Sequence, residues 1–325
     1  MKRLINITDC QEDIARYRDT DDMEQFLNTY GCDGYEFMPV SGAENCRIPN
    51  KLICGLHMRS FNCWMDLWMG NEKALLEEFD SWEQVEKTYG GRKREDLVSY
   101  FRRDLELARR LKVQYVVFHV SEVKIRESFT YNFKYTDEEV VDAAAELINL
   151  LMDGQDYSFY FLMENLWWPG LRFTRPKITW RLLDKVHTEK KGLMLDTGHL
   201  LHTNLELKNQ RDGLEYINRM LDEHQDLLKY IKGVHLQQSI TSEFVKEMKK
   251  TPIEWEKDYY GRWCQVFAYI FQIDLHQPFT EPGVSQMVQR INPQFLTYEL
   301  ISRDREEHER LLREQIAVPD FFALF

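Results

Sequence analysis

The sequence predicts an α/β fold, a single (β/α)8 TIM barrel domain that occupies residues 1–325. Short runs of β-forming residues alternate with longer amphipathic stretches along the whole chain, which is typical of βα units repeated around a parallel sheet. Eight such runs can be counted, and eight parallel strands close a barrel. The length of 325 residues also fits one barrel without a second core.

Each of the eight runs is expected to be one strand of the barrel. In chain order they are RLINIT (3–8), GYEFMP (34–39), LICGLHM (52–58), QYVVFHV (114–120), SFYFLMEN (158–165), GLMLDT (192–197), IKGVHLQ (231–237) and FLTYEL (295–300). The stretches between them carry helical patterns with acidic residues or threonine near their starts. The clearest helical patterns cover 21–30, 94–111, 136–153, 179–189 and 302–317.

Two connections are too long for plain turns, and they follow the third and the seventh strand. They cover residues 59–93 and 238–294. Long connections in compact domains are usually functional or form helices of their own. We therefore expect them to carry lids or specificity elements.

Composition and charge exclude several classes of protein. No segment approaches the roughly 18 uninterrupted apolar residues of a membrane span, and the N-terminus lacks the apolar core of a signal peptide. A net charge of −12 disfavours DNA as the main partner, since phosphate contacts need a basic surface. The six cysteines show no Cys-x-x-Cys spacing and are expected to be plain thiols. We expect a cytoplasmic protein that acts on a small molecule; the sequence does not indicate its oligomeric state.

Six of the eight runs end in histidine or a carboxylate. In a parallel barrel all carboxyl ends of the strands meet at one mouth, so these side chains should converge. Two more candidates, Asp274 and His276, lie in the connection after the seventh run and are spaced so that both can face one way. The candidate ligands are His57, His119, Glu164, Asp196, His199, His235, Asp274, His276 and Glu299.

Histidine and carboxylate side chains are the usual ligands of zinc and manganese. A single strand-end histidine is more often a core or rim residue, but the repetition on six strands favours a metal site. Nine groups exceed the needs of one ion, whereas two or three neighbouring ions would use them all and leave room for water. The pattern therefore predicts up to three divalent ions, zinc or manganese, per chain.

The strand-end motifs MEN, LDTGH, VHL, DLH and YEL resemble those of the xylose isomerase-like TIM barrel superfamily, which includes endonuclease IV and sugar isomerases and epimerases. The endonuclease IV branch holds three zinc ions, and its ligand roles fall on all nine candidates. The sugar isomerase branch holds one divalent ion, and its four ligand roles fall on Glu164, Asp196, His235 and Glu299. The resemblance covers the whole chain, although only these short motifs are specific.

The chain also departs from these families. The seventh run continues as HLQQS, where an acidic residue and a lysine are more usual, and no counterpart of the DNA-bending loops of endonuclease IV is found. Aromatic residues follow the strand ends instead, at Trp64, Trp68, Trp167, Trp168 and Phe173. Trp167 and Trp168 are candidates for stacking on a substrate, with packing over the barrel as the equal alternative, and Arg172 is a candidate anion contact.

Three functions fit this pattern. We favour a phosphoester hydrolase in which ions activate a water molecule and Glu164 bridges two of them. The alternative is a single-metal isomerase or epimerase of a sugar or sugar phosphate, in which Glu164 and Glu299 transfer the proton as acid and base. A barrel that binds metal or ligand without catalysis is the third interpretation.

Overall fold

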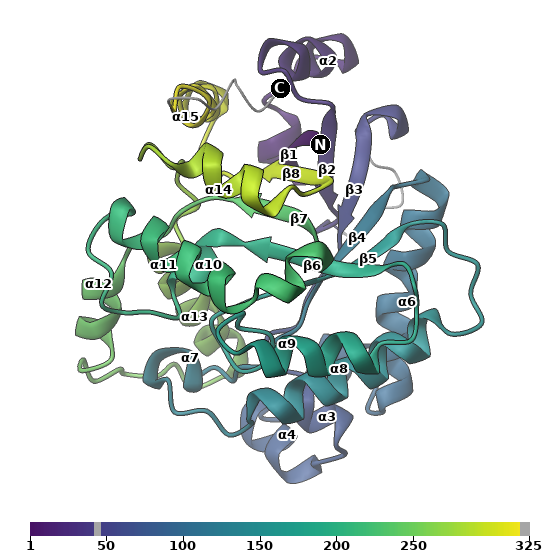
Figure 1. Cartoon of the computed structure of the whole chain (residues 1–325). Helices are drawn as coiled ribbons and strands as arrows, with labels where there is room; N and C mark the ends of the chain where they lie inside the picture. Colours follow the sequence, from purple (N-terminus) through teal and green to yellow (C-terminus); the bar gives the residue numbers. More distant parts are fainter. Residues whose placement is uncertain (42–46, 319–325) are drawn as a thin grey trace.

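The structure is a computed structural model that describes residues 1–41 and 47–318, and it contains a closed barrel of eight parallel strands (Figure 1). The strands pair in chain order, and β1 pairs with β8 to close the ring. They are β1 (Lys2–Thr8), β2 (Gly34–Met38), β3 (Ile53–His57), β4 (Tyr115–His119), β5 (Tyr160–Glu164), β6 (Lys191–Asp196), β7 (Ile231–Leu236) and β8 (Phe295–Tyr298). The predicted fold class is confirmed, and all eight predicted strands are found within one to two residues of their expected ends.

Helices surround the barrel and return the chain from one strand to the next. Outside the two long connections they are α1 (Gln11–Ile14), α2 (Thr20–Thr29), α6 (Arg94–Leu111), α7 (Glu127–Thr130), α8 (Asp137–Met152), α9 (Pro176–Lys185), α10 (Thr197–Leu201), α11 (Gln210–Glu223) and α15 (Arg305–Ile316), with the 3-10 helices η1 (Asn50–Leu52) and η2 (Gln225–Tyr230). Helix α6 has the predicted bounds. Helix α9 begins and ends earlier than the predicted 179–189, because Pro176 occupies its first turn, where a missing N–H costs nothing.

Both long connections form helices of their own, and a role as lids or specificity elements stays a prediction. Residues 59–93 contain α3 (Met65–Trp68), α4 (Glu72–Phe79) and α5 (Trp82–Tyr89). Residues 238–294 contain α12 (Ser242–Met248), α13 (Tyr259–Ile273) and α14 (Val284–Ile291). Between β2 and β3, by contrast, the described residues form no helix other than η1. The ring of helices is therefore thin beside β2 and thick beside β3 and β7.

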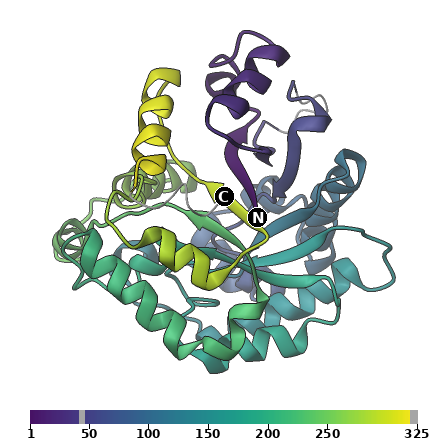
Figure 2. The same cartoon turned by 45° about the horizontal axis from the view of Figure 1, so that its top comes forward.

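The first and last helices complete the outer layer. Helix α15 lies near α2 (Figure 2), and Arg305 of α15 forms an ion pair with Asp22 of α2. No helix of the described residues is long and apolar enough to cross a membrane. None of the five described cysteines is in a disulfide, and Cys46 lies outside the described residues.

The barrel interior has an apolar layer at the amino ends of the strands. It is a separate cluster of buried side chains: Leu4, Cys54, Tyr115, Val117, Leu162, Met194 and Phe295. Small residues on neighbouring strands make room for the large ones. A Cβ atom on Gly55 would lie 2.2 Å from the Tyr115 ring, and one on Gly233 would lie 2.5 Å from Met194. The strands can therefore close around a filled centre rather than a pore.

Candidate metal centre

The nine candidate ligands come together at the carboxyl ends of the strands. Strand register does much of this, because His119 on β4 lies directly beside Glu164 on β5, and Asp196 on β6 lies directly beside His235 on β7. Eight of the nine side chains are buried, and His119 is partly exposed. Their ligand atoms form four overlapping groups, within each of which all ligand atoms lie within 4.8 Å of one another. One group consists of His57, His235 and Glu299, and the other three together include all nine residues.

The first group consists of His57, His119 and Glu164. The Nε2 atoms of His57 and His119 lie 3.1 and 3.3 Å from the same oxygen of Glu164, Oε2. Their rings meet edge to face, with centroids 4.8 Å apart. Two imidazole nitrogens and one carboxylate oxygen thus point at one place, which is a set of protein ligands typical of catalytic zinc sites.

The second group consists of Glu164, Asp196, His235 and Glu299. The Nδ1 atom of His235 lies 3.3 Å from Glu164 Oε1 and 3.2 Å from Glu299 Oε2. Asp196 Oδ2 and Glu299 Oε2 are buried without a hydrogen-bond donor among the described residues. Since a buried carboxylate oxygen without a partner is costly, these two oxygens fit a position opposite a cation.

The third group consists of His199, Asp274 and His276. Asp274 Oδ2 lies 3.3 Å from His199 Nε2 and 3.0 Å from His276 Nε2. His276 has a left-handed backbone with φ of 47°, a conformation that costs free energy for a residue other than glycine and is often found at functional sites. Its backbone N–H donates to Ser239 Oγ, which helps to hold it there.

The histidines of the first and third groups are oriented by backbone carbonyl groups. The Nδ1 atoms of His57, His199 and His276 lie 3.0 Å from the carbonyl oxygens of Met58, Asn165 and Glu299, respectively. A protonated Nδ1 that donates to a carbonyl leaves Nε2 free as the metal ligand. In each of these three residues it is Nε2 that faces the carboxylates of its group.

The pKa values of the carboxyl and imidazole groups in the centre depend on one another. Burial alone would raise the pKa of Glu164, but the charges of His119 and His235 outweigh it and hold that pKa well below its usual value. Burial raises the pKa of Asp196 to about 8, and the neighbouring carboxylates of Glu299 and Glu164 add to the effect. Because one carboxyl favours a proton while another rejects it, the centre needs compensating positive charge, which protons or metal ions can supply.

One buried acid behind the centre was not among the sequence-derived candidates. Glu36 lies on β2, and its Oε1 is 2.9 Å from His235 Nε2. Its Oε2 accepts hydrogen bonds from Tyr115 Oη at 2.5 Å and Thr297 Oγ1 at 3.0 Å. A carboxylate behind a ligating histidine fixes the ring and raises its basicity. Glu36 stands in the middle of a β-rich run, so no strand-end signal marks it.

A second polar network supports the ligands from β7. Gln237 Nε2 donates to Asp196 Oδ1 at 3.0 Å, and Ser239 Oγ donates to Gln237 Oε1 at 3.0 Å and Asp274 Oδ1 at 3.1 Å. These are the residues of the HLQQS segment in which the chain departs from the families it resembles. The amide and the hydroxyl thus link ligands of the second and third groups.

The three candidate substrate contacts lie in packed or paired positions. Trp167 and Trp168 are 3% and 2% exposed, and the Trp167 ring lies against His199 and His202, with centroids 5.3 and 4.7 Å away. Arg172 lies 2.9 Å from Asp137. The tryptophans cover the third group, and these positions favour packing over direct contact with a substrate. Trp64, Trp68 and Phe173 are buried as well.

Comparisons with known proteins identify the family and similar folds. A model of the family described as xylose isomerase-like TIM barrel matches residues 89–315. A putative xylose isomerase from Rhodospirillum rubrum superposes with a TM-score of 0.54 at 13% identity, over 99% of each chain. Endonuclease IV from Thermus thermophilus gives a TM-score of 0.52 at 16% identity, over 100% of this chain and 98% of the other.

A D-tagatose 3-epimerase-like protein gives a TM-score of 0.51 at 14% identity, over 99% of this chain and 100% of the other. A search of curated proteins gives no match. At these identities the likeness to solved structures concerns the fold alone, and an endonuclease and an epimerase are equally similar to this chain.

Proposed function

The chain belongs to the xylose isomerase-like TIM barrel family, and from this premise we propose that it is a hydrolase of phosphoesters that uses up to three divalent ions, zinc or manganese. Ions held by these residues would activate a water molecule and stabilise the leaving oxygen. The proposal rests on one observation above all, the third group of ligands.

The third group supports a hydrolase because a single-ion centre does not require it. The second group alone, with Glu164, Asp196, His235 and Glu299, is a complete set for one ion. His199, Asp274 and His276 form a further set with its own short contacts. Buried histidine and carboxylate pairs are expensive to keep, and a role in holding a second or third ion explains them.

Glu164 is the residue that joins the groups. Its Oε2 faces His57 and His119, whereas its Oε1 lies 3.3 Å from His235 Nδ1 and 3.2 Å from His199 Nδ1. A carboxylate whose two oxygens face different groups of ligands would be able to bridge two ions, and Glu164 has this arrangement. Glu299, 3.2 Å from His235 and at the edge of the buried centre, is placed to exchange a proton with a substrate.

We propose a small phosphoester rather than DNA as the substrate. The net charge is −12, which opposes binding to a polyanion. Arg59 and Arg172, which follow strand ends, are paired with Asp104 and Asp137. The ions themselves would therefore be the main contact for a phosphate group.

The second candidate function is a single-metal sugar isomerase or epimerase. It is favoured by the completeness of the second group, in which Glu164 Oε1 and Glu299 Oε2 lie 3.3 and 3.2 Å from the same atom, His235 Nδ1. In that function the two carboxylates would remove and return a proton beside a polarised carbonyl. The first and third groups would then bind substrate or serve the structure.

Metal content and one pair of variants separate the two functions. Elemental analysis of the purified chain should find two to three ions for the hydrolase and one for the isomerase. Asp274→Ala should remove one ion and abolish hydrolysis of bis(4-nitrophenyl) phosphate, with Asp153→Ala, an exposed aspartate, as the matched control. Proton exchange of D-fructose in D2O that survives Asp274→Ala, together with a single bound ion, would establish the second function instead.

A further inference from the structure

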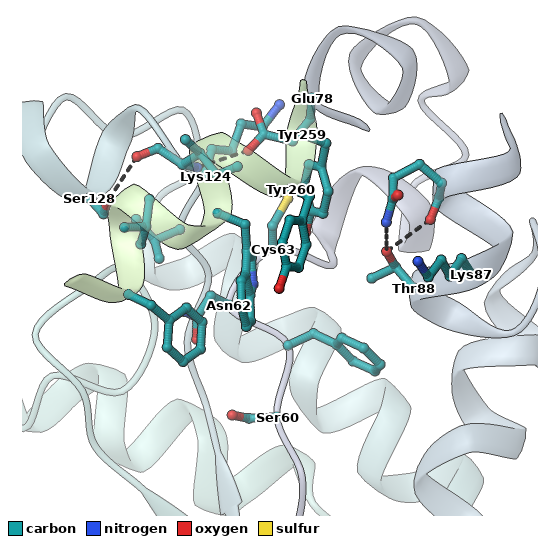
Figure 3. A pocket seen from close by; sticks show the side chains of 17 residues that line it. Ser60, Asn62, Cys63, Glu78, Lys87, Thr88, Lys124, Ser128, Tyr259 and Tyr260 are labelled. Carbon is teal, nitrogen blue, oxygen red and sulfur yellow. Dashed lines mark hydrogen bonds between the residues drawn. The ribbon is translucent and has the colours of Figure 1, made fainter. Parts of the chain in front are cut away.

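A cavity of about 370 Å³ lies between the segments that follow β3 and β4 and helix α13, and none of the nine candidate ligands lines it. Its walls come from the segments that follow β3 and β4 and from helices of the two long connections. Figure 3 shows Tyr259 and Tyr260 in the middle of the view, with Lys124 and Ser128 on one side and Lys87 and Thr88 on the other. Its size and mostly apolar lining are those of a small-molecule site.

Helix α13 lines this cavity with aromatic side chains. Tyr260, Trp263 and Phe267 follow one another along the helix, with ring centroids 6.1 and 3.9 Å apart. Tyr260 is 66% exposed. The opposite side of the helix, with Tyr269 and Ile273, is already buried. A surface helix that is apolar on both sides indicates a binding function for its outer side.

Two polar side chains at the cavity have unused hydrogen-bonding groups. Glu78 accepts a hydrogen bond from the Ile125 N–H with Oε1, at 2.8 Å. Within residues 1–41 and 47–318, neither its Oε2 nor the side-chain amide of Asn62 makes a hydrogen bond. Burial raises the pKa of Glu78, and its Oε2 is left to accept a hydrogen bond. Lys124 is neutralised by Asp66, and Lys87 is an exposed residue of the lining. The apolar lining with polar groups beside it therefore suits a ring with polar edges.

The cavity is fixed in shape by an anchor between α13 and α4. The buried Arg262 donates from Nη2 to the carbonyl oxygen of Glu78 at 2.9 Å and to Asp80 at 2.8 Å. The Tyr259 ring packs on Phe79, with centroids 4.6 Å apart. A site held in this way needs little rearrangement to accept a ligand.

The lining is close to the first ligand group along the chain. Ser60 follows His57 by three residues, and Val123 follows His119 by four, which limits the separations to about 11 and 14 Å. The Val123 N–H donates to the carbonyl oxygen of Asn62 at 2.6 Å, so the two segments form one floor. A ring in the cavity and a phosphate at the ions can thus belong to one small molecule.

We propose that this cavity is a subsite for a planar aromatic ring with a hydrogen-bonding edge, the chemistry of a nucleobase or of a phenolic group, carried by the substrate of the metal centre. The ring stacks on Tyr260 and Trp263, and its edge meets Asn62 and Glu78. The assignment of the ring to the substrate rests on the proposed function. The binding of an aromatic ring in the cavity does not depend on that function.

Calorimetric titration of the full chain with adenosine, phenyl β-D-glucopyranoside and methyl β-D-glucopyranoside tests the subsite. We expect at least one of the two aromatic probes to bind and the methyl glucoside not to bind. Tyr260→Ala and Trp263→Ala should each weaken binding about tenfold, the usual effect of removing one stacking ring, whereas Trp263→Phe should retain it. Phe271→Ala is the matched control, since Phe271 is an exposed aromatic residue of α13 outside the cavity.

The comparison of probes separates the two sources of the ring. A larger loss of adenosine binding than of phenyl glucoside binding in Asn62→Ala would support a nucleobase, and tighter binding of the phenyl glucoside by the unaltered chain would support a phenolic group. Equal binding of the methyl glucoside, absence of binding by both aromatic probes, or an equal loss in Phe271→Ala would overturn the proposal.

Metal removal separates the subsite from the proposed function. Adenosine or phenyl glucoside should bind equally well after treatment with a chelator. Adenosine 5′-monophosphate and phenyl phosphate should bind more tightly than the uncharged probes only in the metal-loaded protein. If they do not, the ring is not part of the substrate, and the link to the metal centre is overturned while the subsite stands.

Discussion

The two ends of the barrel interior are built on opposite principles. At the amino ends of the strands, a layer around Leu162 and Met194 is fully apolar and buried. At the carboxyl ends, the same strands bury carboxylates and histidines that face one another at 3 to 4 Å. The lower layer gains free energy from burial, whereas the upper layer needs compensating charge to be tolerated. The apolar layer therefore stabilises the folded barrel, and this stabilisation offsets the free energy that the buried charges of the other layer cost.

Tyr115 connects the two layers. Its ring lies in the apolar layer against Gly55, and its hydroxyl group donates to Glu36 behind His235. The packed ring of Tyr115 therefore fixes the position of its hydroxyl group, and the hydroxyl group in turn positions Glu36 behind His235. The contrast between the layers predicts which changes affect activity and which affect stability.

The largest effect is expected from Glu164→Gln, in the upper layer. The amide cannot offer a negative oxygen to each of two groups, so activity should fall on the order of 10³-fold, which corresponds to several kcal/mol of lost charge stabilisation. Metal content and the rate of hydrolysis measure the effect. Glu206→Gln, at an exposed position, should leave both unchanged. Full activity with a full metal content in Glu164→Gln would remove the bridging role from this residue.

The lower layer should respond to Leu162→Ala in the opposite way. Leu162 is fully buried beside Gly192 and Gly233, and the cavity left behind should cost about 2–5 kcal/mol of unfolding free energy. Urea denaturation measures this, and activity per folded molecule should stay unchanged. The exposed Leu150→Ala is the control, with an expected change within about 0.5 kcal/mol. If Leu162→Ala lowered the metal content as well as the free energy of unfolding, the two layers would not be separable.

A smaller effect is expected from Gln237→Ala, which removes support without removing a ligand. Gln237 holds Asp196 and, through Ser239, the segment that carries Asp274. Loss of such a supporting residue typically weakens metal affinity about 10–100-fold. Competition with a metal indicator dye measures the affinity, and the exposed Gln272→Ala is the control. Affinity equal to that of the unaltered chain would show that the network orients nothing.

The sequence predicts the architecture well because strands and helices are marked by the spacing of apolar residues within short segments of the chain. The strands were visible as apolar runs, and α6 was predicted to the residue. The nine candidate ligands come together in the structure for the reason given at the outset: the ends of parallel strands share one mouth. Whether each of them binds an ion stays a prediction.

The features that could not be predicted from the sequence depend on the direction in which a side chain points. Glu36 sits inside a strand, and only the register of β2 against β3, where it lies beside Gly55, turns it inward. Trp167 and Trp168 follow a strand end just as the ligands do, yet they turn into a packed cluster with Val245 and Ile273. The exposed aromatic residues at the cavity, Tyr260 and Trp263, belong to α13, and no strand end in the sequence marks that helix.

The divided carboxylate of Glu164 makes the ion sites thermodynamically linked. An ion held between Oε2 and the first group would orient and polarise Oε1 toward the second, so filling one site changes the affinity of the other, and the change must be reciprocal. Because the two cations repel each other and share the charge of one carboxylate, the second ion should bind more weakly than the first. Chains with a partly filled centre should consequently be common at intermediate metal concentrations, and a titration with metal should show separate steps.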